Sequence, residues 1–95
     1  MTREDKLVLV ALYRAFEEKK DTHPIYNYFL QQEKVDEFLR ILIRLEQMGF
    51  VTTPTNAWTY VNSLPYDVVM SAVIITYMGK QVARKILRQA RERSN

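Results

Sequence analysis

Residues 33–51 read EKVDEFLRILIRLEQMGFV, and their apolar side chains have the spacing of one helix face. They recur at positions i, i+3, i+4, i+7 and i+10, namely Val35, Phe38, Leu39, Leu42 and Leu45. Three further apolar residues widen this surface beyond one stripe: Ile41, Ile43 and Met48. Gly49 suits a left-handed helix end, and Phe50 and Val51 begin an extended segment. The stretch therefore predicts a helix that ends at a glycine and leads into a strand.

Two helices are expected before this stretch. Thr2 and Asp5 have the spacing of a capping pair, which predicts a first helix over about residues 3–19. A second helix is predicted over about residues 24–31, where Thr22 or His23 can cap and Pro24 suits the first turn. The junction LQQEK, residues 30–34, contains neither Gly nor Pro. One long helix over residues 24–48 therefore stays open as an alternative.

After residue 51 the pattern favours strands and then a last helix. Residues 57–61 fit either a strand or a bound loop. Residues 68–76 are apolar and β-branched, which predicts a strand, with a helix starting at Pro65 as the competing interpretation. Thr76 is expected to cap the last helix. The apolar stripe of that helix contains Met78, Val82, Ile86 and Ala90.

Length and composition indicate one globular domain in an intracellular protein. The chain has 95 residues, 47% of them hydrophobic, and no cysteine, which excludes disulfides and thiolate metal sites. The opening MTREDK is too polar for a signal peptide, and residues 68–75 are too few to span a bilayer, which takes about 20 apolar residues. We therefore expect a cytoplasmic protein with no membrane segment.

Charge is distributed unevenly along the chain. Residues 1–75 contain eight Lys or Arg and ten Asp or Glu, whereas residues 76–95 contain six and one. A basic tail of this kind is typical of proteins that meet an anionic partner, and it also suits the C-terminal end of a helix dipole. Contact with an anionic membrane surface through this tail is a weaker alternative, because its apolar side is modest.

The order helix, helix, helix, strand, wing-like loop, strand, helix resembles the winged helix-turn-helix superfamily. Two stretches carry the resemblance. FLRILIRLEQMGFV is similar to the family's recognition helix, with Leu42 and Leu45 before Gly49. VIITYMGKQVARKIL is similar to its last strand and final helix, with Thr76 as the cap and Gly79 and Lys80 behind it. Small PadR-like and MarR-like regulators, and short regulators from phages and plasmids, are the nearest groups. The resemblance implies a mainly α fold with a small β wing, covering residues 1–95 as one domain and ending in a basic helix over residues 76–95.

The resemblance also implies a function. It predicts a homodimeric transcriptional regulator or mobile-element control protein that binds double-stranded DNA, with the subunits paired through the last or the first helix. The positions of the third helix that would face the groove are Gln32, Lys34, Asp36, Glu37, Arg40 and Arg44. The basic residues of the last helix would hold phosphates or flank the dimer: Lys80, Arg84, Arg88 and Arg91. A purely structural interpretation stays open, in which Arg40 and Arg44 are solvated and pair with Asp36 or Glu37.

The wing departs from the family pattern. Between Arg44 and Lys80 there is no Lys or Arg, so the wing has no charge with which to contact phosphates. An alternative function is therefore a protein–protein interaction module that uses Trp58 and Tyr60. A lone Trp in such a domain also packs commonly over its own core.

Catalysis finds little support in the sequence. His23 is the only histidine, and no glycine-rich phosphate-binding loop occurs. Asp36 and Glu37 are adjacent on a helix and point about 100° apart, which does not suit paired acid–base chemistry. We expect a protein that is not an enzyme and that needs neither a metal nor another cofactor.

Overall fold

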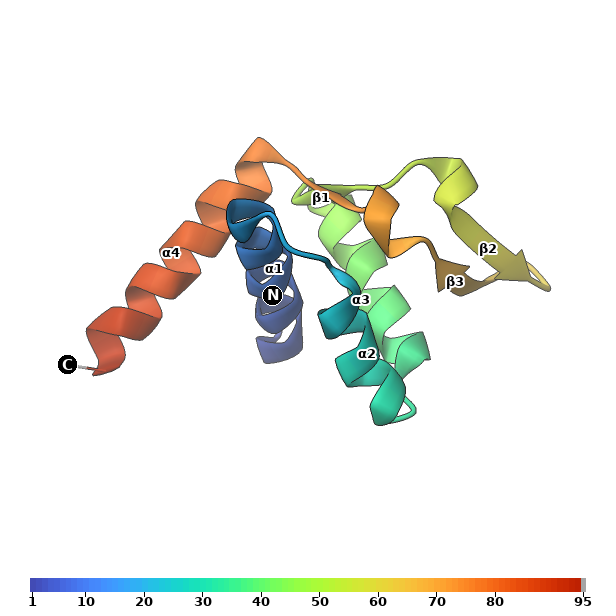
Figure 1. Cartoon of the computed structure of the whole chain (residues 1–95), viewed down its shortest axis with the longest axis horizontal. Helices are drawn as coiled ribbons and strands as arrows, with labels where there is room; N and C mark the ends of the chain where they lie inside the picture. Colours follow the sequence, from blue (N-terminus) through green and yellow to red (C-terminus); the bar gives the residue numbers. More distant parts are fainter. Residues whose placement is uncertain (95) are drawn as a thin grey trace.

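The computed structural model describes residues 1–94 and has a mainly helical α+β fold of winged-helix-like arrangement, as the sequence predicts (Figure 1). The elements are, in chain order, α1 (Arg3–Glu18), α2 (His23–Gln31), α3 (Val35–Gln47), β1 (Val51–Thr52), β2 (Trp58–Val61), β3 (Leu64–Val68), β4 (Ile74–Ile75) and α4 (Tyr77–Ser94). Two short 3-10 turns, Thr55–Ala57 and Met70–Ala72, interrupt the second half of the chain.

The strands form two separate antiparallel pairs. β1 pairs with β4, with Val51 opposite Ile75 and Thr52 opposite Ile74. β2 pairs with β3, and this hairpin, residues 58–68, is called the wing below. Its turn residues Asn62 and Ser63 have φ of 53° and 65°, the left-handed pair that a tight two-residue hairpin turn requires.

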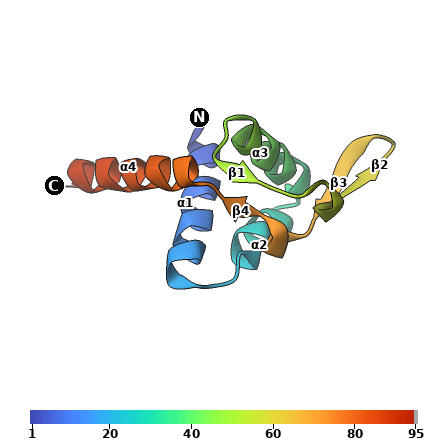
Figure 2. The same cartoon turned by 90° about the horizontal axis from the view of Figure 1, so that it is seen from above.

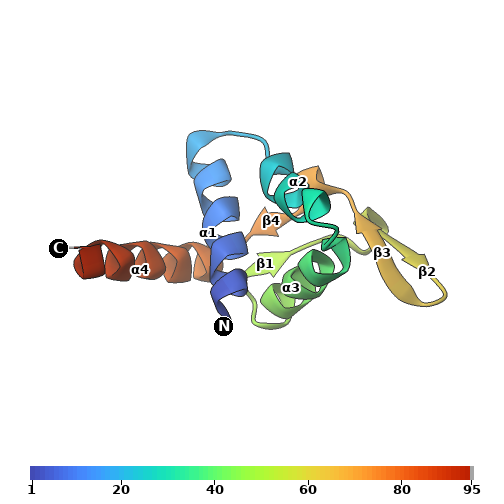
Figure 3. The ribbon, with the colours of Figure 1, turned by 90° about the horizontal axis from the view of Figure 1, so that it is seen from below.

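The molecule is elongated, with principal extents of 48 × 27 × 24 Å. α4 projects at one end of the long axis and the wing at the other, while α1, α2 and α3 lie between them (Figures 2 and 3). α1 and α4 lie close together at the start of α4 and diverge toward its C-terminal end (Figure 1). The wing and the distal half of α4 are therefore the two parts that extend from the body.

The hydrophobic core forms around α3. Five of its residues are buried, which explains the wide apolar surface in the sequence: Phe38, Leu39, Ile41, Leu42 and Leu45. They pack against a buried stripe of α1 that includes Val8, Leu9 and Leu12, and against Phe29 of α2. Burial of each such side chain contributes about 1.5–3 kcal/mol, so α3 and α1 supply most of the hydrophobic stabilisation.

Local capping fixes the ends of α1. The hydroxyl of Thr2 accepts from the N–H of Asp5 at 3.1 Å, and the Asp5 carboxylate accepts from the N–H of Thr2 at 3.1 Å. This reciprocal capping box confirms the predicted pair. The helix ends at Glu18 and Lys19 adopts the left-handed conformation, one residue from the predicted end.

α2 and α3 are separate helices, so the single helix over residues 24–48 is excluded. Glu33 has a φ of 57°, and the N–H of Lys34 returns to the carbonyl of Phe29 at 2.9 Å. Thr22 occupies the N-cap position of α2, as predicted, but its side chain makes no capping bond. The Thr22 hydroxyl instead donates to the carbonyl of Met70, and Asp21 accepts from the N–H of His23.

The single strand predicted over residues 68–76 is confirmed only at Val68 and at Ile74–Ile75, and the competing helix from Pro65 was wrong. Val68 ends β3, the turn Met70–Ala72 follows, and only Ile74 and Ile75 form β4. The physical reason is that β3 pairs with β2 whereas β4 pairs with β1. The chain must leave one pair and enter the other, and the turn makes that change. Residues 64–67 of β3 lie outside every strand predicted from the sequence.

The junction between α3, β1 and α4 has the predicted glycine and threonine roles. Gly49 has a φ of 81°, and Thr76 caps α4 by accepting from the N–H of Gly79 at 3.0 Å. The Thr76 hydroxyl also donates to the carbonyl of Gly49 at 2.6 Å. A Cβ on Gly79 would lie 2.0 Å from the carbonyl oxygen of Phe50. Only glycine therefore lets α4 start this close to the strand.

Candidate nucleic-acid interface

α2 and α3 form the helix–turn–helix of the molecule. Three residues join them, and aromatic packing fixes their angle. The ring of Phe38 lies 5.2 Å from that of Phe29 and 5.6 Å from that of Tyr26, the second pair edge to face. Such pairs each contribute roughly 0.5–1.5 kcal/mol beyond their area burial, so α3 is held rigidly on α2.

The outward side of α3 is exposed to solvent and carries mixed charge. Its exposed residues recur at helical spacing: Asp36, Arg40, Arg44 and Gln47. Half-buried Ile43 lies among them. We call these five residues the α3 face. One acid and two arginines make its charge weakly positive, so it suits contact with base edges better than strong attraction to phosphates.

Arg44 is not available on this face in the way the sequence suggests. Its guanidinium donates to the carboxylate of Asp5 at 2.7 Å, and Asp5 is only 2% exposed. Burial of Asp5 works to raise its pKa, but the bonds from Arg44 and Thr2 outweigh it and hold the pKa below its ordinary value. Arg44 therefore joins α3 to the start of α1. The alternative in which Arg40 and Arg44 pair with Asp36 or Glu37 was wrong, because Arg44 pairs with Asp5 and Arg40 makes no ion pair within residues 1–94.

Lys34 lies at the start of α3 beside acidic side chains. A hydrogen bond between the carboxyls of Glu4 and Glu37, together with their mutual repulsion, raises the pKa of Glu4, and Lys34 acts in the opposite direction. Lys34 makes no ion pair within residues 1–94. Its positive charge is thus partly compensated but its amine can still bind a ligand.

Arg40 has the most favourable position on the α3 face. It is exposed and has no ion-pair or hydrogen-bond partner in the described part of the chain. It lines a groove of about 130 Å³ between α3 and the wing, together with Asp36, Leu39, Leu64 and Pro65. Its guanidinium can therefore turn outward without breaking an existing interaction.

α1 binds the first two basic residues of α4. The Lys80 amine lies 3.7 Å from the centre of the Phe16 ring. Arg84 donates to the hydroxyl of Tyr13 at 2.9 Å and lies 3.6 Å from the carboxylate of Glu17. These contacts fasten α4 to α1. Sequence spacing gives no signal for Tyr13, Phe16 and Glu17 as partners, because each lies more than sixty residues from the residue that it contacts.

The distal half of α4 is different. Arg88 and Arg91 are exposed and have no partner in residues 1–94, and the same is true of Lys85 and Arg93. Val82 and Ile86 of the predicted apolar stripe pack on the core, whereas Met78 and Ala90 are exposed. The structure thus divides the predicted basic stripe into a part that is bound within the chain and a part that extends into solvent.

The two aromatic residues predicted for the wing have different environments. Trp58 is half-buried and packs against the core. Tyr60 is 54% exposed, and its ring lies 6.5 Å from that of Trp58. Trp58 therefore anchors the wing to the body, and Tyr60 is the aromatic residue that a partner can reach.

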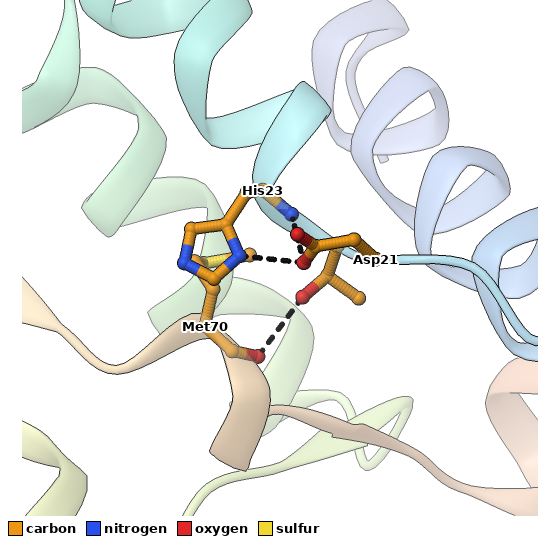
Figure 4. A network of polar contacts seen from close by, with 4 residues as sticks. Asp21, His23 and Met70 are labelled. Carbon is orange, nitrogen blue, oxygen red and sulfur yellow. Dashed lines mark hydrogen bonds and ion pairs between the residues drawn. The ribbon is translucent and has the colours of Figure 1, made fainter.

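The single histidine is part of a polar network that ties α2 to the turn before β4 (Figure 4). The Asp21 carboxylate accepts from the backbone N–H of His23 and contacts its Nδ1, and these bonds lower the pKa of Asp21. Thr22, between them, donates to the carbonyl of Met70 at 3.1 Å. Within residues 1–94, no group of three His, Cys, Asp or Glu side chains gathers as a metal would need.

Comparisons with known proteins returned no match to a family model, a curated protein or a solved structure. None of the helices in the described part of the chain has the length and apolar character that crossing a membrane requires.

Proposed function

We propose that this chain is a DNA-binding protein of the winged-helix type. The observation that supports this most is the helix–turn–helix itself, in which α3 is rigidly held, exposes one side and carries an unpaired Arg40, with Lys34 at its N-terminal end. A helix of this kind fits the width of the major groove. An exposed arginine can donate two bonds to guanine, which would give the face its base preference.

The residues divide into two roles under this proposal. Arg40 and Gln47 would approach base edges, and Lys34 a phosphate. Arg88 and Arg91, with their neighbours Lys85 and Arg93, would lie along phosphates. Arg44, Lys80 and Arg84 would contribute less than the sequence suggests, because each already has a partner in the chain.

A transcriptional regulator or a control protein of a mobile element is the role that we propose, inside the cell and without a catalytic step. Affinity for non-specific DNA should be moderate and strongly dependent on salt, because phosphate contacts come from only a few cations. Two subunits would each present one α3 to successive turns of the duplex.

The test is fluorescence anisotropy of a labelled random duplex across a salt series. Wild-type protein should bind at low salt, with log K falling linearly against log salt. Arg40→Ala should weaken binding by about tenfold, the value of one good arginine contact. Arg14→Ala is the matched control, since it removes the same charge from an exposed position of α1. The proposal fails if the protein does not bind at low salt, and the assignment of Arg40 fails if both variants bind alike.

One observation favours a second candidate, a protein–protein interaction module. The wing exposes large apolar side chains at its tip, among them Tyr60 and Leu64. Because Trp58 supports the fold, Tyr60→Ala is the better probe of a partner contact than Trp58→Ala. A partner complex that survives Tyr60→Ala would count against this candidate.

A further inference from the structure

β2, the outer strand of the wing, contains no charged residue and no proline, although its pairing with β3 shifts register between Thr59 and Tyr60. The wing as a whole carries little charge. Asp67 is its only charged residue, and its carboxylate is occupied by the hydroxyl of Tyr26 at 3.0 Å and the N–H of Val68 at 2.8 Å. The exposed apolar residues are Tyr60, Val61, Leu64 and Tyr66, between 48% and 68% exposed. Natural proteins usually protect an exposed edge with charges or proline. A neutral apolar hairpin of this kind is typical of a surface that another chain covers.

β2 is the open edge of the wing. β3 lies on the body side, where Asp67 bonds to α2 and Pro65 lies beside α3, whereas β2 pairs only with β3 (Figure 1). In an antiparallel pair, residues that exchange two backbone bonds alternate with residues that exchange none. Tyr60 lies opposite Pro65, which has no N–H, so Tyr60 belongs to the second kind. Its N–H and C=O therefore point away from β3.

We propose that β2 pairs in antiparallel fashion with β2 of a second copy of this chain, across a two-fold axis at Tyr60. The two Tyr60 residues would then exchange both of their outward backbone bonds, with Thr59 of each copy opposite Val61 of the other. The result is a four-stranded sheet in which both open edges are used, so that the assembly closes as a dimer.

A second copy fits this edge for two physical reasons. First, an antiparallel pair centred on one residue is its own complement, so the same backbone pattern satisfies both chains. Second, a neutral strand meets a neutral strand, and no unpaired charge is buried. Trp58 and Tyr60 lie on one side of β2 with their rings 6.5 Å apart. The dimer would align four aromatic rings, and cross-strand aromatic pairs are among the most stabilising in sheets.

The proposed interface differs from the one that the sequence suggests, which pairs the subunits through the last or the first helix. The apolar stripe of α4 packs largely on its own core through Val82 and Ile86, and Lys80 and Arg84 are bound to α1. The first half of α4 is therefore engaged within the chain, and only its distal half is left for a second subunit. The pairing through β2 does not depend on DNA binding, and it is tested on the protein alone.

Sedimentation velocity over a series of protein concentrations tests the proposal. We expect wild-type protein to dimerise, and Tyr60→Lys and Tyr60→Pro each to weaken dimerisation at least about tenfold. Proline removes the outward N–H and no bond to β3, but it also fixes φ near −65°, so circular dichroism checks that the fold is kept. Tyr28→Lys is the matched control, because Tyr28 is half-exposed on α2, outside the wing.

Amide hydrogen exchange on the wild-type protein gives a second measurement that needs no variant. Protection of the Tyr60 amide should increase with protein concentration, whereas that of Val69, which donates to Ala57 within the chain, should not. A protein that stays monomeric at all concentrations overturns the proposal. So does a dimer that tolerates both Tyr60 variants, or a Tyr60 amide whose exchange is independent of concentration.

Discussion

Replacing Asp5 and Arg44, singly and together, tests how the start of α1 is joined to α3. Asp5 accepts a bond from Arg44 at 2.7 Å and caps the N–H of Thr2 at 3.1 Å. Loss of the cap costs about 1 kcal/mol. A bond to a charged group contributes roughly 1.5–3 kcal/mol when buried, but the Arg44 side chain is 44% exposed. Screening by solvent therefore brings the coupling to about 1 kcal/mol.

Asp5→Ala should accordingly lower the free energy of unfolding by about 2 kcal/mol, or roughly 10 °C in melting temperature for a domain of this size. Urea unfolding of the wild type, both single variants and the double variant gives the coupling as a double-mutant cycle. Strictly additive effects would refute the ion pair. Asp5→Ala should also release Arg44 on the α3 face, so the affinity of this variant for duplex DNA at low salt should be higher than that of the wild type. A fall in affinity would contradict the placement of that face against DNA.

Three further predictions follow from single contacts. Gly79→Ala should destabilise the fold by about 3 kcal/mol or more, because its Cβ would clash with the backbone of Phe50; a melting temperature within about 5 °C of the wild type would contradict this. Folding lowers the pKa of Asp5, so its carboxylate contributes stability above about pH 4 that is lost as the pH falls through the folded pKa. The free energy of unfolding of Asp5→Asn should therefore fall less steeply with decreasing pH than that of the wild type. Arg84→Ala should lower the melting temperature but leave the salt dependence of DNA binding nearly unchanged, because Arg84 is bound to Tyr13. Arg88→Ala should leave the melting temperature nearly unchanged but reduce the salt dependence measured by anisotropy, because Arg88 is exposed.

The elements with local signals could be predicted from the sequence. The capping box of Thr2 and Asp5, the left-handed Gly49 and the Thr76 cap each depend on residues within four positions of one another. The apolar spacing of α3 likewise predicts its buried side, because one helix presents it. Such local signals are enough to predict the order of the helices and the class of fold.

Features that depend on distant partners could not be predicted in this way. β3 contains Pro65, which argues against a strand until β2 is seen beside it. The partner of Arg44 is 39 residues away, and those of Lys80 and Arg84 lie on the opposite end of the chain. A count of charges cannot show which basic residues already have partners, whereas the structure shows that each of these three makes a contact within the chain. The candidate site is therefore smaller than the sequence suggests and centres on Arg40.

The most direct test of the central claim is a titration of isotope-labelled protein with a short duplex, followed by the backbone amide signals in NMR spectra. The DNA-binding account predicts shifts on the α3 face and on residues 85–93 of α4, with little change on the far side of α2 around Leu30. Absence of shifts at low salt, or shifts confined to the wing, would contradict it.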